Sequence, residues 1–337
     1  MTLLAPHLTA FLAERLPKER RASVHTCDTY AYAFKLLVVW AAERLRTTPS
    51  ALTLEQLDAP CLLTFLEYLE TDRKNSVRSR NARLAALKSF ARFVEYRVPA
   101  CVDQVRRILA IPAKKGDEGL VGYLTRPEMQ ALLDAPTQRA PSGLRDRAML
   151  HLAYAGGLRV SELVGLCITD LTLQPTATVR VRGKGRRERV LPLWKTTTKV
   201  LREWLSVRQT TTTPALFTNA HGEPLTRAGF AHVLALHVAT ATRTQPSLAS
   251  KRVSPHVLRH TCAMHTLEAT GDIRKVALWL GHATLQSTEV YVRADPTEKL
   301  DALRGTVPTT LRPGRFRPPD QLIAALRPAP KGRAYVK

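Results

Sequence analysis

Acidic residues are scarce in this chain of 337 residues, in which 28 Asp and Glu face 51 Lys and Arg and leave a formal net charge of +23. An excess of one sign on this scale requires a polyanionic partner. Most of the basic residues are Arg, whose planar guanidinium binds phosphate with two parallel hydrogen bonds. The composition therefore predicts a partner made of nucleic acid.

Paired cysteines and long apolar runs are missing as well. The five cysteines are odd in number, widely spaced and without a C-x-x-C pair, so the sequence predicts neither a disulfide framework nor a zinc ribbon. No apolar run reaches the 18 residues typical of a membrane-spanning helix, and residues 1–21 lack the charged start of a secretory signal. We therefore expect a cytoplasmic, nucleoid-associated protein with no membrane partner.

Apolar residues in the first part of the chain recur with the spacing of amphipathic helices. The stretches 30–45, 62–69 and 84–94 each carry one apolar stripe. The pattern of Thr53 to Gln56 has the form of a capping box and predicts a helix start there. Residues 1–111 are therefore predicted to form an all-helical, DNA-binding domain.

The stretch 112–121 is polar, contains glycine and has no periodicity, as expected of an exposed linker. A second domain, 122–306, follows it and opens with Thr125-Arg-Pro-Glu128, another capping box. Residues 307–337 form a basic, proline-rich C-terminal extension, for which docking on a neighbouring protomer and a basic tail without structure are both open interpretations.

Two β-rich runs in the second domain, 177–182 and 188–193, flank the turn Gly183-Lys-Gly-Arg-Arg187 and predict a hairpin. Helices are predicted to follow, with starts at Pro255, after Asp272 and at Thr284. The fold class predicted is mainly α with a small β-sheet, in which a helical domain precedes an α+β domain.

Residues able to perform chemistry are concentrated in the second domain. His256 and Arg259 lie three apart and share one helix face, so a proton-transfer group and a phosphate-binding group would point the same way. By itself this pattern also fits a helix cap beside an ordinary ion pair. It gains weight from three further elements, namely Ala155-Gly-Gly-Leu-Arg159-Val-Ser-Glu-Leu163, the hairpin residue Lys184, and Leu280-Gly-His282 followed nine residues later by Tyr291.

In their order along the chain these elements resemble the tyrosine recombinases, the phage-integrase and Xer-like group. The resemblance covers about 120 to 305, and residues 1–111 loosely resemble the family's core-binding domain. It implies a tyrosine recombinase catalytic domain and a site-specific recombinase acting on double-stranded DNA through a Holliday junction. It also implies a tetramer on DNA, formed by this chain alone or with related recombinases, and the C-terminal extension favours a mobile element and DNA integration, excision or transposition.

Phosphodiester chemistry suits these residue types. Guanidinium groups stabilise the charge of the transition state, a tyrosine can form a 3′-phosphotyrosine ester that stores the bond energy, and a lysine can protonate the leaving 5′ oxygen. Histidines can accept the tyrosine proton and hydrogen-bond the phosphate. No metal or other cofactor is needed. The candidate catalytic residues are Arg159, Lys184, His256, Arg259, His282 and Tyr291.

Other polar residues receive supporting roles. Glu162 is expected to orient an arginine or a histidine, and His260 and His265 are interpreted as buried structural residues. His256 and His260 do not form a zinc motif, because Val257 stands where H-E-x-x-H has its glutamate. Contacts to the DNA backbone are expected from Arg78, Arg80, Arg83, Lys88, Arg92, Arg182, Arg186 and Arg187.

Two other functions fit the same residues. A type IB topoisomerase resembles this constellation but acts as a monomer without site specificity, whereas a non-catalytic DNA-binding protein would keep only the fold. The presence of Tyr291 together with both candidate arginines disfavours the second alternative. Relaxation of any supercoiled plasmid by the monomer would favour the first.

Overall fold

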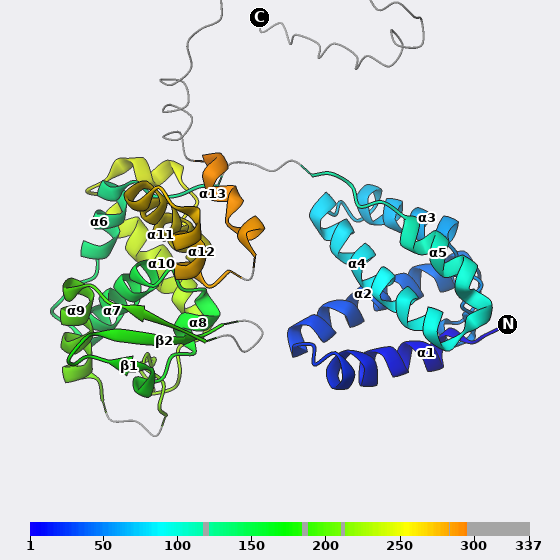
Figure 1. The fold of residues 1–337 in the computed structure, drawn as a ribbon, viewed down its shortest axis with the longest axis horizontal. Coiled ribbons are helices and arrows are strands. Elements are labelled where there is room, and N and C mark those ends of the chain that lie inside the picture. Colours follow the sequence, from blue (N-terminus) through cyan, green and yellow to red (C-terminus); the bar gives the residue numbers. More distant parts are fainter. Residues whose placement is uncertain (117–120, 184–187, 210–212, 283, 295–337) are drawn as a thin grey trace, which may run out of the picture. The chain divides into compact units, whose positions relative to one another are not determined.

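The computed structural model describes residues 1–116, 121–183, 188–209, 213–282 and 284–294. It divides into two compact units, Met1–Gly119 and Leu120–Lys337 (Figure 1), each of which is described by itself. Both are mostly helical, and the second also contains a small sheet. The fold class expected from the sequence is confirmed.

The first unit is built from helices around an aromatic core. The ring centroid of Phe11 lies 5.4 Å from that of Phe90 and 6.0 Å from that of Phe34, and all three side chains are buried. Edge-to-face packing of this kind adds to the free energy gained by burying the rings. The elements are α1 Leu4–Ala10, a π-helical segment Phe11–Glu19, α2 Val24–Arg44, α3 Ala59–Thr71, α4 Val77–Arg97 and α5 Val102–Ala110, with 3₁₀ turns at Pro49–Ala51 and Pro99–Cys101.

The predicted helix start at Thr53 is wrong. The α3 helix begins six residues later, where the Asp58 carboxylate accepts a hydrogen bond from the Cys61 backbone N–H at 2.9 Å. Thr53 makes only half of a capping box, since its N–H donates to Gln56 while its own hydroxyl is buried without a partner among the described residues. Asp58 is followed by Ala59 and Pro60, and proline is well suited to the first turn of a helix.

The second unit combines its helices with a three-stranded antiparallel sheet in the order β1-β2-β3 (Figure 1). Val179 on β2 pairs with Leu191 on β3, and both side chains are buried. The elements are α6 Arg126–Asp134, α7 Pro141–Ala155, α8 Val160–Val164, β1 Leu171–Thr172, β2 Thr178–Arg182, β3 Glu188–Pro192, α9 Lys195–Val207, α10 Arg227–Ala241, α11 Pro255–Thr270, α12 Ile273–Leu280 and α13 Glu289–Ala294, with 3₁₀ turns at Ile168–Asp170, Pro246–Ser250 and Leu285–Ser287.

The helices that carry the candidate site end where the sequence predicts. Gly271 and Gly281 follow α11 and α12 in the left-handed conformation, at φ +59° and +65°, which glycine adopts without steric cost. The Asp272 carboxylate caps α12 by accepting from Arg274 N–H at 2.8 Å. Thr284 leads first into a 3₁₀ turn, so α13 starts only at Glu289.

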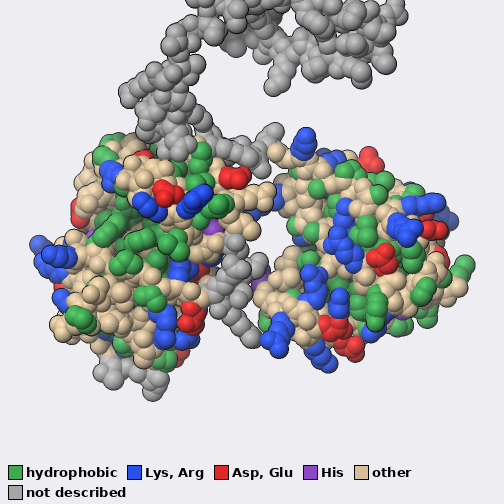
Figure 2. Space-filling view, viewed as in Figure 1, with side chains coloured by type: hydrophobic (Ala, Val, Ile, Leu, Met, Phe, Trp, Pro, Cys, Tyr) green, Lys and Arg blue, Asp and Glu red, His purple; other side chains and the backbone are tan. Residues whose placement is uncertain are grey.

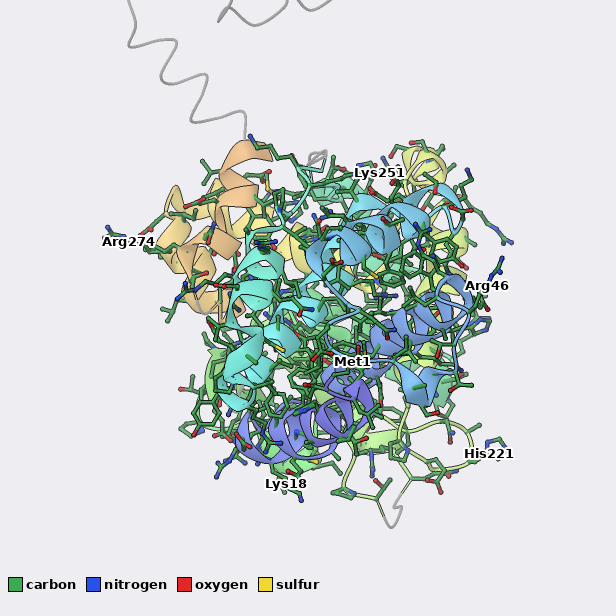
Figure 3. All side chains as sticks on the ribbon, turned by 90° about the vertical axis from the view of Figure 1, so that its right-hand side faces the viewer. Met1, Lys18, Arg46, His221, Lys251 and Arg274 are labelled. Atoms are coloured by element: carbon green, nitrogen blue, oxygen red, sulfur yellow. The ribbon has the colours of Figure 1, made fainter. Side chains whose placement is uncertain are left out.

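Hydrogen bonds join the start of the second unit to residues far along the chain. Thr125 and Glu128 form the predicted capping box, and the buried Glu128 carboxylate also accepts from Lys251 at 2.6 Å and Ser247 at 2.7 Å. Leu124 N–H donates to the Thr261 hydroxyl at 3.0 Å. The segment between α10 and α11 is therefore fastened to the N-terminus of α6. Lys251 is labelled in Figure 3.

A buried histidine on α7 is expected to make the protein less stable in acid. His151 is 6% exposed and its Nε2 has no hydrogen-bond partner among the described residues. Burial, and then Arg147, lower its pKa from 6.5 to about 4. The unfolded chain therefore binds more protons below pH 6.5, and about 3 kcal/mol of stability is lost as the pH falls from 7 to 4. His151→Leu should remove this part of the pH dependence of the urea unfolding free energy.

The control for that measurement is His221→Gln, because the side chain of His221 is exposed (labelled in Figure 3). Its unfolding free energy should follow the wild-type pH dependence. Equal acid sensitivity of His151→Leu and the wild type would refute the assignment to His151.

Candidate active site

The candidate site begins at a sharp turn between α7 and α8. Gly157 has φ +54°, and a Cβ added there would lie 2.5 Å from Leu280 Cδ2, so only glycine fits. Arg159 follows as the N-cap residue of α8, and its backbone N–H donates to Glu162 Oε2 at 3.0 Å. The guanidinium of Arg159 also donates to Glu162 Oε1 at 2.8 Å while its side chain stays one third exposed. The turn therefore presents Arg159 at the surface with its base anchored.

Arg259 is held against the same turn from α11. Its guanidinium donates to the carbonyl oxygen of Gly157 at 2.5 Å and to that of Leu280 at 2.8 Å, and the residue is only 4% exposed. Burial, and then the charge of Arg159, lower its pKa to about 10, so it stays charged at neutral pH. Two of its five N–H groups are used by these carbonyls.

Glu162 is the acidic residue that lies close to three arginines. Besides Arg159 it accepts from Arg189 at 2.8 Å and lies 3.9 Å from the Arg259 guanidinium. Burial opposes ionisation of this carboxyl, but the hydrogen bonds from Arg189 and Arg159 keep its pKa below the usual value. The role predicted for Glu162, orienting an arginine, thus has a geometric basis, and its charge makes the approach of the arginines possible.

Arg189 is a member of this cluster that sequence reasoning missed. It lies on β3 opposite Val181, on the face of the strand that also buries Leu191, and its side chain is 11% exposed. A Cβ added at Gly281 would lie 3.0 Å from its side chain, which accounts for glycine there. The sequence signal for Arg189 was the alternation of inward and outward residues along the strand. A charged residue at an inward-facing position requires a buried partner.

Tyr291 lies in the core beside this cluster. It is 2% exposed and packs among side chains of α11 and α12, including Met264 and Leu280. Its hydroxyl forms a hydrogen bond of 3.0 Å with Nδ1 of His260, a residue that the sequence had suggested to be merely structural. Burial raises the pKa of Tyr291, against the opposing effect of Arg259.

The two histidines proposed from the motif occupy different places. His282 lies next to the tyrosine, with the ring centroids 6.4 Å apart, and its Nδ1 is hydrogen-bonded to the Thr288 hydroxyl at 2.8 Å. Burial, and then Arg259, lower its pKa to about 4, so it is neutral at pH 7. His256 is exposed at the start of α11, with its ring 6.4 Å from that of His260.

An open cleft adjoins the arginine cluster. Its lining includes Arg159, Arg189, His282, Gly183 at the end of β2 and Arg274 on α12. Arg274 is exposed and is labelled in Figure 3. The hairpin residues Lys184, Arg186 and Arg187 lie outside the described residues, as does the extension 307–337.

The residues expected to contact DNA divide by exposure. Arg78 and Arg92 on α4 are exposed, and so is Arg182 on β2, which pairs with Glu188 at 3.2 Å. The Arg83 guanidinium lies over the Tyr32 ring at 5.2 Å. Figure 2 shows Lys and Arg side chains spread over the visible face of both units, and none of the helices that the structure describes is long and apolar enough to cross a membrane.

Arg80 and Lys88 have other partners. Arg80 is 3% exposed and donates to the carbonyl oxygen of Pro112, and Lys88 donates to that of Leu109. Their charged groups satisfy backbone carbonyls in the last turn of α5 and just after it. Arg80 is therefore buried within the first unit rather than available to DNA, whereas Lys88 is half-buried and its contact with DNA stays a prediction. Within the described ranges, no three His, Cys, Asp or Glu residues are grouped to hold a metal ion.

The arginine cluster, the buried tyrosine and the antiparallel sheet together define the class of tyrosine recombinases, enzymes that break and rejoin DNA strands. The chain belongs to the phage integrase family, whose model matches residues 122–298, and the model of the phage integrase N-terminal SAM-like domain matches residues 8–97. The family expected from the sequence is thus confirmed, and the chain is a site-specific recombinase.

Relatives match over most of the chain. It is 45% identical over 323 residues to the y4rC protein of Sinorhizobium fredii, covering 96% of this chain and 97% of that protein. It is 35% identical over 277 residues to the tyrosine recombinase XerC of Pelobacter propionicus, covering 82% and 87%. The XerD recombinase of Listeria monocytogenes serotype 4b is 34% identical over 281 residues, covering 81% and 89%.

Solved structures share the fold. The XerH site-specific recombinase bound to the difH substrate after cleavage superimposes with a TM-score of 0.67 at 22% identity, over 88% of this chain and 84% of that chain. The Tn1549 transposon integrase in complex with a circular intermediate DNA gives a TM-score of 0.67 at 14% identity, over 89% and 99%.

Proposed function

We propose that this recombinase cuts double-stranded DNA at specific sites by attack of Tyr291 on one phosphodiester. The observation that carries the proposal is the convergence of three elements, which bring together the buried Arg259 from α11, the partly exposed Arg159 at the start of α8 and the buried Tyr291 from α13. The positive charge of the arginines stabilises the transition state, and their preassembly around Glu162 removes the need to gather them during the reaction.

The chemical step is a transfer of one phosphodiester bond. The oxygen of Tyr291 forms a bond to phosphorus, the bond from phosphorus to the 5′ oxygen breaks, and a 3′-phosphotyrosine remains. Lys184 gives a proton to the leaving 5′ oxygen, the hydroxyl proton of Tyr291 passes to a neighbouring histidine, and His256 and His282 hydrogen-bond the phosphate. The reverse reaction with a second strand rejoins the DNA without an external energy source.

The biological setting that we propose is exchange of strands through a Holliday junction in a tetramer within the nucleoid. The integrase of transposon Tn1549, which is similar in fold, was solved with transposon DNA, and this supports a role in a mobile element. The alternative assembly that we propose is a tetramer formed with a recombinase of related sequence.

The test is covalent trapping on a duplex that carries a nick close to the cleavage position, so that the short cut strand diffuses away. The wild-type protein should accumulate a DNA adduct, and peptide mapping should place the phosphate on Tyr291. An adduct on another residue would refute the nucleophile assignment. Relaxation of a supercoiled plasmid without recombination sites by monomeric protein would instead favour the topoisomerase alternative.

A further inference from the structure

Two histidine rings lie next to the nucleophile, those of His260 and His282, but only His260 reaches its hydroxyl. His260 Nδ1 lies 3.0 Å from the Tyr291 oxygen, whereas the ring nitrogen Nδ1 of His282 is occupied by Thr288. His256 is exposed, with its ring 6.4 Å from that of His260. The group in direct contact with the reacting oxygen is therefore the histidine next to Arg259, which no role above uses.

The direction of this hydrogen bond follows from the surroundings. Burial, and then His256 and Arg259, lower the pKa of His260 to about 4, so the ring is neutral at pH 7. A neutral ring with its proton on Nε2 offers Nδ1 as an acceptor, and the buried phenol needs an acceptor for its single O–H. When Tyr291 donates to His260, both oxygen lone pairs stay available to attack phosphorus.

We propose that His260 is a positioning residue, which holds the hydroxyl of Tyr291 through Nδ1 and directs its lone pairs toward the scissile phosphate. This inference rests on the proposed function of Tyr291 and adds a residue to it. A misplacement of about 1 Å at a reacting atom costs on the order of 100-fold in rate, so loss of the hydrogen bond should be visible in the chemical step.

The charges that face His260 set the pH range in which it works. They are His256 and Arg259 on α11, His282 after α12, and the phenol of Tyr291 itself. Protonation of His260 would turn Nδ1 into a donor and occupy a lone pair of the nucleophile. Cleavage by the wild type should therefore fall as the pH decreases through the pKa of His260.

The test compares His260→Asn with His260→Leu. The Asn carbonyl oxygen occupies nearly the position of Nδ1 and accepts the same hydrogen bond without titrating, whereas Leu fills the space and accepts nothing. We expect single-turnover cleavage of the nicked duplex to slow roughly 10- to 100-fold in His260→Leu. His260→Asn should stay close to the wild-type rate at pH 7 and lose the decline at low pH.

A second tyrosine–histidine pair, whose histidine also lies on α11, serves as the control. The Tyr154 hydroxyl lies 2.8 Å from His265 Nδ1, outside the candidate site. His265→Leu should leave the cleavage rate of folded protein unchanged. Equal rates for His260→Leu and the wild type would overturn the positioning role, as would an equal loss in His260→Asn. An adduct formed by the wild type on a residue other than Tyr291 would overturn the proposed function instead.

Discussion

Tyr291→Phe is expected to abolish the covalent DNA adduct, with cleavage reduced by at least roughly 10⁴-fold, because the variant loses the attacking oxygen and nothing else in the site replaces it. The phenyl ring keeps the packing against Met264 and Leu280. The loss of one hydrogen bond leaves His260 Nδ1 unpaired, at a cost of about 1–3 kcal/mol in stability. Binding to a duplex, measured by gel shift, should be nearly unchanged.

The matched control is Tyr154→Phe. It removes the same kind of hydrogen bond, from a tyrosine to a histidine on α11, at a place away from the cleft. Its stability should fall by a similar amount while adduct formation continues at the wild-type rate. Adduct formation by Tyr291→Phe would show that another residue is the nucleophile.

Arg259→Lys is expected to slow cleavage by about 10²- to 10³-fold although the charge is kept. The guanidinium bridges the carbonyls of Gly157 and Leu280 with two of its five N–H groups. A lysine has three donors on one atom and cannot span both carbonyls and the substrate. Single-turnover cleavage on the nicked duplex measures the loss, and the DNA dissociation constant should change less than threefold.

Arg145→Lys controls for loss of a buried guanidinium as such. Arg145 donates to Asp146 at 2.7 Å and to the Thr218 carbonyl at 3.0 Å, away from the cleft. It should reduce the urea unfolding free energy without slowing cleavage by the folded protein. A normal cleavage rate in Arg259→Lys would mean that a single positive charge is sufficient for cleavage and that the planar guanidinium is not needed.

Local patterns predicted the helix ends well because the groups that satisfy them are neighbours in sequence. The capping box of Thr125 and Glu128 and the cap at Asp272 each involve residues no more than three apart. The same holds for Glu162, whose contact with Arg159 lies within one helical turn. Thr53 is not the helix start because Asp58 caps the helix instead, with Pro60 in the first turn that follows it.

Contacts between distant residues could not be predicted in this way. Arg80 has the appearance of a surface arginine at the start of α4, but the chain returns 32 residues later and places the Pro112 carbonyl beside it. Arg189 reaches Glu162 across 27 residues, and His260 meets Tyr291 across 31. Nothing in the local sequence fixes such contacts. The residue types therefore indicated the chemistry of the site, but which residues contact each other could be seen only in the folded structure.

The hydrogen bonds between α6 and the segment before α11 affect the order in which the protein folds during synthesis. Leu124 and Glu128 bond to Thr261, Ser247 and Lys251 across 119 to 137 residues, so these bonds form only after the later partners leave the ribosome. The helical unit ends before residue 120 and has no such requirement. At about 5–20 residues per second the delay is on the order of ten seconds. The helical unit therefore folds first during synthesis, while α6 and α7 await the segment that completes their surroundings.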